Sequence, residues 1–154
     1  MNDVQQFVQH WWSHRQVLPK LLQAIPDDKA DFRPWDKAMS VTELVMHIAS
    51  TAYKFVDGVA NGRFEPGWEK PQAESLADAR RILDEFTAKT RARLESLTPA
   101  HLANTVDGQA VFRFSAPGSV FLASALDHEI HHKGQLFVYA RMAGAESVPF
   151  FSAR

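Results

Sequence analysis

Apolar residues recur every three or four positions through four long stretches of this sequence, and turn-forming residues separate the stretches. This spacing places the apolar side chains on one face of a helix. The expected helices span about 3–25, 40–62, 75–99 and 117–144. Because each helix must bury its apolar face against a neighbour, the spacing predicts an all-α, up-and-down four-helix bundle. A chain of 154 residues has the size of one domain, so we expect a single domain over residues 1–154.

Residues typical of helix ends support these limits. Ser40 and Glu43 have the spacing of a capping box, in which each side chain bonds to the backbone N–H of the other residue. The helix that they begin is expected to end near Asn61-Gly62. The expected start and stop residues of the other helices are Asn2, Ser75, Pro117 and Gly144.

Two segments interrupt this pattern near the start of the chain. Pro19 lies inside the first helical stretch, and because proline removes an amide donor we expect a kink or a restart near residues 17–18. The connection Pro26–Met39 is long for a plain bundle, and we expect Phe32 and Trp35 to anchor it.

A small hairpin or loop insertion is expected before the last helix. Residues 104–114 contain Asp107-Gly108, a dipeptide typical of tight turns, and a short alternation of apolar and polar residues over 111–114 follows it.

Charge and hydropathy exclude several classes of protein. The chain has 17 Lys and Arg against 18 Asp and Glu, a formal net charge of −1, and lacks the basic excess that nucleic-acid phosphates require. No segment approaches the roughly 20 apolar residues of a membrane span, and the N-terminus lacks the pattern of a secretory signal. We therefore expect a cytoplasmic protein that binds neither nucleic acid nor a membrane.

Cysteine is absent from the sequence. This excludes disulfide bonds, cysteine-ligated zinc or iron–sulfur sites and a cysteine nucleophile. A metal ion would have to bind to His, Asp or Glu side chains.

Three of the seven histidines lie within five residues of the last helix. His128 and His132 are four residues apart, which puts them on one helix face with Cβ atoms about 5–6 Å apart, close enough to bind one metal ion. His131 points about 100° away from His132. A third ligand must come from another helix, and His47, on the edge of the apolar face of the second helix, is the leading candidate.

The alternative for each of these histidines is a hydrogen-bonded core residue without a metal. A lone histidine on an apolar face favours that interpretation, but a pair at i,i+4 with a third buried histidine favours a metal site. The remaining histidines, which lie near a chain end or a turn, are expected at the surface: His10, His14 and His101.

The same segment matches H-E-x-x-H, in which two histidines bind zinc and the glutamate, here Glu129, acts as general base of a metalloprotease. The pattern is short, and Glu146 is the one acidic residue after His132, so candidates for a downstream ligand are few. Serine-triad, phosphate-loop and dinucleotide-binding motifs are absent from the sequence.

The sequence resembles the DinB-like metal-binding four-helix bundles, and the likeness extends from the first helix to Gly144. The residues that carry it are Phe32-Arg33-Pro34, Ser40–Leu44 with His47, and His128–Gln135. The resemblance implies a divalent metal, zinc or nickel, on His47, His128 and His132. Lys133 stands where the family frequently has arginine, a change that keeps the charge. A bacterial, cytoplasmic origin is a further implication.

Relatives in that family include transferases that use low-molecular-weight thiols, so the resemblance implies a thiol-dependent enzyme with a small-molecule substrate. The competing hypotheses are a non-catalytic metal-binding stress protein and a metal-dependent hydrolase. Glu129 is the candidate catalytic residue, and Glu43 and Gln135 are further candidates for contact with the ligands or for proton transfer. A homodimer is expected because two-fold assemblies are the commonest.

Overall fold

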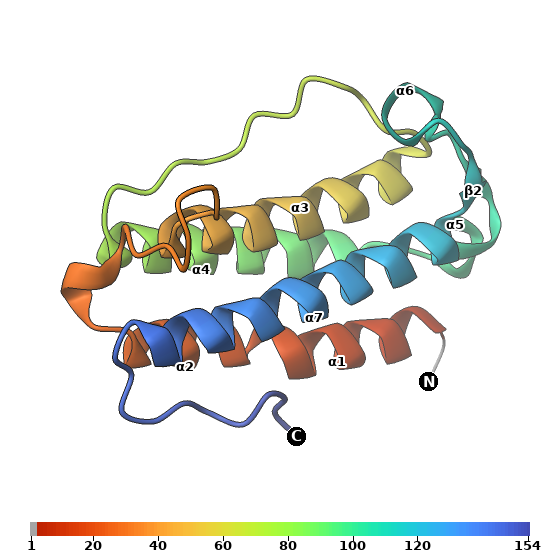
Figure 1. The fold of residues 1–154 in the computed structure, drawn as a ribbon. Helices are drawn as coiled ribbons and strands as arrows, with labels where there is room; N and C mark the ends of the chain where they lie inside the picture. Colours follow the sequence, from red (N-terminus) through yellow and green to blue (C-terminus); the bar gives the residue numbers. More distant parts are fainter. Residues whose placement is uncertain (1–2) are drawn as a thin grey trace.

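The computed structural model describes residues 3–154 and confirms an all-α four-helix bundle (Figure 1). The first helix of the bundle consists of α1 and α2, and the other three are α3, α4 and α7. Their bounds are Asp3–Arg15, Val17–Ala24, Val41–Asn61, Leu76–Glu95 and Gly118–Met142. The short elements are η1 (Asp27–Lys29), α5 (Pro99–Ala103), β1 (Thr105–Val106), α6 (Gln109–Phe112) and β2 (Ala116–Pro117). Among the described residues, no helix is long and apolar enough to cross a membrane.

The helix ends largely follow the sequence signals. The helix is interrupted at Gln16, and Pro19 lies in the first turn of α2. Backbone N–H groups in the first turn of a helix have no intrahelical acceptor, so proline costs no hydrogen bond there. Ser40 and Glu43 form the expected capping box at the start of α3, and Gly62 ends α3 with a positive φ of 76°. Ser75 caps α4 as expected, whereas Asn2 lies outside the described residues.

The helix directions differ from a simple up-and-down order in one place. Arg93 near the end of α4 bonds to Asp57 and Asn61 near the end of α3, at 3.1 and 2.7 Å, so α3 and α4 run parallel. Figure 1 shows the connecting segment, 62–75, running back along the whole length of α3 before α4 begins. An extended segment of this length reaches about 45 Å, more than the roughly 30 Å of α3.

The insertion before α7 contains the expected pairing, but one strand lies in a different place. Thr105 and Val106 pair with Pro117 and Ala116, whereas the predicted second strand at 111–114 is wrong, because α6 occupies its first half. The helical turn of α6 directs Phe112 into a cluster of aromatic rings, 4.9 Å from the ring of Phe64. That packing outweighs the weak alternation in the sequence.

The loop before α3 is anchored by one of its two expected aromatic residues. Phe32 packs against the core, with its ring 6.3 Å from that of Tyr139. The prediction for Trp35 is wrong, because its side chain is 63% exposed. Trp35 begins a turn that the Ala38 N–H closes onto its carbonyl oxygen, at 3.0 Å, and the ring stays outside.

The core has two apolar halves with polar residues between them. On α7, one half ends at Leu126 and the other begins at Leu136. Between these two leucines, four polar residues of α7 are buried or half-buried: His128, Glu129, His132 and Lys133. The helix α7 therefore directs its buried polar groups to one level of the bundle, where each needs a partner.

Two glycines provide a matched test of the packing around α3. A Cβ at Gly58 would lie 2.3 Å from the ring of Phe64, while one at Gly134 would have no atom outside its own helix backbone within 4 Å. We expect Gly58→Ala to lower the free energy of unfolding by about 1–3 kcal/mol through overpacking. Gly134→Ala should raise it by up to about 1 kcal/mol through helix propensity. Urea denaturation of both variants measures the difference, and equal effects would contradict the packing argument.

Candidate metal centre

Three imidazole rings from two helices meet within the polar level of the bundle. His47 extends from α3, and His128 and His132 extend from adjacent turns of α7. The Nε2 atom of His47 lies 2.9 Å from Nε2 of His128 and 3.2 Å from Nε2 of His132. One ligand nitrogen from each residue lies within 4.8 Å of the others, and all three side chains are partly exposed. The sequence predicted these three residues, and the structure brings them together.

The donor set fits a divalent metal ion. Bonds of about 2.0–2.1 Å to a tetrahedral ion would place ligand nitrogens about 3.3 Å apart, close to the observed 2.9 and 3.2 Å. In a neutral imidazole Nε2 has either one proton or one lone pair, so Nε2 of His47 can form a well-directed hydrogen bond with only one of the two other Nε2 atoms. A shared cation satisfies all three nitrogens at once.

The protonation state of the cluster also suits a metal. Burial lowers the pKa of His47 and that of His128 to about 4, from an ordinary value of 6.5. Electrostatic repulsion from Lys70, and from His128 and His132, lowers the pKa of His47 further. Burial lowers the pKa of His132 as well. The three rings are therefore neutral at physiological pH, the form that binds metal ions.

Side chains outside the cluster orient two of the rings. Nδ1 of His132 lies 2.7 Å from Oε1 of Gln135 and donates its proton to it, which leaves Nε2 as the acceptor. Thr51 Oγ1 lies 3.5 Å from Nδ1 of His47, one helical turn away. Gln135 was a sequence candidate, whereas Thr51 was missed, although its position four residues after His47 is the spacing that signals such a contact. His131 lies beside His132 but is not part of the cluster.

We expect Gln135→Ala to weaken metal binding by about 10- to 100-fold, because the hydrogen bond that fixes the His132 tautomer is lost. Gln135→Glu should keep most of the affinity, since a carboxylate accepts the same proton. Competition with a chromophoric chelator measures both, and Gln23→Ala, at an exposed position on α2, is the control. Equal affinities for the Gln135→Ala and Gln23→Ala variants would contradict the orienting role.

Metal retention should also have an unusual pH dependence. Protons compete with metal for ordinary histidines once the pH falls through about 6.5. The pKa of His47 and of His128 is lowered to about 4, so the nitrogens stay unprotonated at lower pH. We therefore expect affinity to be nearly constant from pH 8 down to about 5.5 and to fall below that. Chelator competition across this range checks the result, and a loss centred on pH 6.5 would contradict it.

The two glutamates proposed from the sequence do not join the cluster. Both carboxylate oxygens of Glu129 accept hydrogen bonds inside the protein, from Arg15 Nε at 2.5 Å, Arg15 Nη2 at 3.0 Å and Trp11 Nε1 at 2.9 Å. Glu129 and Arg15 are almost completely buried. Glu43 bonds to Arg33 and to the backbone of Ser40 at the start of α3. The bonding of Glu129 favours a structural role over that of a general base.

A second polar group lies on the same side of α7 as Glu129. Lys133 is buried, lies 2.7 Å from Nδ1 of His14 and donates to the carbonyl oxygen of Phe151 in the C-terminal segment. Burial lowers the pKa of Lys133 to about 8. The expected surface position of His14 is wrong, because α1 packs its His14 face against α7 and only 7% of the residue is exposed.

Comparison with known proteins agrees with the fold. The family model described as DinB family matches residues 1–153. The uncharacterized protein YjoA of Bacillus subtilis strain 168 is 36% identical over 149 residues, which cover 97% of this chain and 96% of YjoA. The crystal structure of YjoA, a DinB-like protein, superposes with a TM-score of 0.85 at 34% identity, covering 97% of this chain and 99% of YjoA.

A DinB-like protein from Bacillus cereus ATCC 10987 shares the fold at 22% identity, with a TM-score of 0.78 over 95% of each chain. The family match extends over nearly all of the sequence, and YjoA is similar over nearly its whole length. The chain therefore belongs to the DinB family.

Proposed function

We propose that this protein is a metal-dependent enzyme in which His47, His128 and His132 hold a divalent ion, zinc or nickel, and a small thiol from solution serves as nucleophile. The observation that carries the proposal is the convergence of three Nε2 atoms at a partly exposed site. Three protein ligands leave a coordination position for an exogenous molecule, as in catalytic sites, whereas structural sites use four protein ligands.

The thiol must come from outside because the chain contains no cysteine. When bound to the three histidines, a divalent ion would lower the pKa of a coordinated thiol so that it is ionised at neutral pH. The reaction that suits this arrangement joins the thiol sulfur to an electrophilic carbon as a leaving group departs. The chain would contribute neutral imidazoles held in the correct tautomer by Gln135.

The contacts of Glu129 support hydrolysis of the H-E-x-x-H type less than they support the thiol reaction. In that chemistry the glutamate must accept a proton from a water molecule. The carboxylate of Glu129 instead accepts hydrogen bonds from Arg15 and Trp11 and is 1% exposed. These bonds hold the carboxylate against α1.

Cobalt-substituted protein offers a direct test. Addition of 2-mercaptoethanol or of a larger thiol should produce a strong sulfur-to-metal charge-transfer band if the thiolate binds the ion. Turnover of thiol with a panel of electrophiles, followed as loss of free thiol, should require both metal and thiol. The His128→Ala variant is the control, since it should show neither band nor turnover.

A non-catalytic metal-binding protein would show a tightly held ion without turnover for any electrophile. Cleavage of peptides or esters without added thiol would instead identify a hydrolase. Absence of the charge-transfer band with every thiol would contradict the proposed role of the thiol.

A further inference from the structure

A cavity of about 490 Å³ lies at the start of α3, between this helix and residues 70–73 of the connecting segment. Its volume is within the range of small-molecule sites, about 300–1,000 Å³. Glu43 and Met46 line the cavity, one turn before His47 and next to it in the sequence. These two lining residues therefore lie within about one helical turn, roughly 5 Å along the axis, of His47 on α3.

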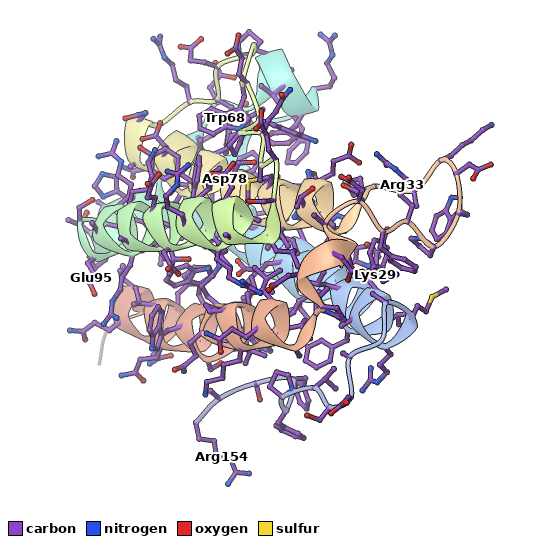
Figure 2. The ribbon with its side chains drawn as sticks, turned by 90° about the vertical axis from the view of Figure 1, so that its left-hand side faces the viewer. Lys29, Arg33, Trp68, Asp78, Glu95 and Arg154 are labelled. Atoms are coloured by element: carbon purple, nitrogen blue, oxygen red, sulfur yellow. The ribbon has the colours of Figure 1, made fainter. Side chains whose placement is uncertain are left out.

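Two cationic side chains line this cavity, and they differ in their partners. Arg33 bonds to both carboxylate oxygens of Glu43, at 2.7 and 2.9 Å, and to the carbonyl oxygen of Ala38, so its charge is neutralised. Figure 2 shows Arg33 on the loop that precedes α3. Lys70 is exposed and forms no salt bridge within the part of the chain that the structure describes.

Lys70 lines the same cavity as Met46, the residue that precedes His47 on α3. A small anion in this cavity would therefore lie near the unpaired ammonium group of Lys70 and near the helix that carries His47.

We propose that this cavity binds the carboxylate of a small-molecule substrate, with Lys70 as the residue that selects it. The inference rests on the proposed function, because the ion on the histidines supplies the second positive charge. Lys70 provides one free cation, and the Asp31 carboxylate in the same lining disfavours a doubly charged phosphate. Met39, Met46 and Pro71 give the lining an apolar part that suits the hydrocarbon portion of such a molecule.

The test compares isosteric ligands that contain no sulfur, so that it does not depend on the thiol. Zinc-loaded protein is titrated with butyrate, with neutral butyramide and with inorganic phosphate, and binding is followed by ligand-observed NMR or calorimetry. We expect butyrate to bind about tenfold more tightly than butyramide and more tightly than phosphate, since a charge-assisted hydrogen bond contributes about this much.

Substitutions of Lys70 assign the preference to its charge. Lys70→Met should remove the tenfold advantage of butyrate, and Lys70→Arg should keep it. Lys20→Met, on the exposed face of α2 and outside the cavity lining, should bind all three ligands as the unaltered protein does. Circular dichroism confirms that each variant is folded, which is expected because Lys70 lies in an exposed segment.

Several results would overturn the inference. These are equal binding of butyrate and butyramide, a preference for phosphate, or an unchanged butyrate preference in the Lys70→Met variant. The proposed function is tested separately, with thiols such as 2-mercaptoethanol that have no carboxylate. It fails if no thiol produces a charge-transfer band in the cobalt protein. A Lys70-dependent preference for butyrate in that case would still support the carboxylate site.

Discussion

Replacement of His128 or His132 by alanine is expected to lower the affinity for a divalent metal at least 100-fold, from a starting stoichiometry of about one ion per chain. Each substitution removes one of three Nε2 atoms that meet within 4.8 Å. Two remaining imidazoles rarely make an adequate site. His47→Ala should have a similar effect, although this residue comes from a different helix, because the ion needs ligands from both.

The matched control is His131→Ala, a substitution of the same residue type on the same helix. His131 is exposed and lies outside the cluster, so this variant should keep one ion per chain. Elemental analysis of untagged protein after exhaustive dialysis gives the stoichiometry, and chelator competition gives the affinity. Retention of metal by a variant in which all three cluster histidines are alanine would show that the ion binds elsewhere.

The helices and the histidine cluster could be predicted because both depend on short-range rules. The capping box of Ser40 and Glu43 and the restart after Gln16 follow from groups that interact within a few residues. The pair His128 and His132 follows from the helical repeat. His47 required one further step, which was that an imidazole on an apolar helix face needs a partner.

The helix directions could not be predicted by the same rules. Residues 62–75 contain the glycine and proline residues of a turn-rich connection, and such connections usually join antiparallel helices. The length of the segment was the one feature that indicated parallel helices, since the segment is long enough to run back along α3. Phe64 packs into a buried position against Gly58 at the start of this return, a long-range contact that periodicity does not reveal.

The surroundings of Glu129 show a further limit of the sequence. The sequence made Glu129 a candidate catalytic residue beside the metal ligands, because helical geometry does not name the partner of a buried carboxylate. Trp11 and Arg15, four residues apart on α1, supply the donors. Their spacing was visible, yet a surface arginine and a buried one look alike in a sequence.

A large loss of unfolding free energy is expected when the buried ion pair of Arg15 and Glu129 is broken. Glu129→Ala leaves the Arg15 guanidinium, whose side chain is 0% exposed, without a counter-charge. Removal of one partner of a buried pair typically costs about 3–5 kcal/mol of unfolding free energy. Urea denaturation in the presence of a chelator measures this cost without a contribution from metal. Asp127→Ala, at the exposed neighbouring position on α7, should change the unfolding free energy by no more than about 0.5 kcal/mol.

A double variant that regains the lost stability distinguishes a structural role of Glu129 from a catalytic one. In the Arg15→Met, Glu129→Leu double variant no unpaired charge remains, and much of the lost stability should return, because apolar replacements of buried ion pairs are often neutral or stabilising. Recovery should stay incomplete, since Trp11 Nε1 and Thr87 Oγ1 each lose a partner. The folded double variant should still bind metal through its three histidines. A Glu129→Ala protein as stable as Asp127→Ala, but without turnover, would instead show that this carboxylate serves the chemistry.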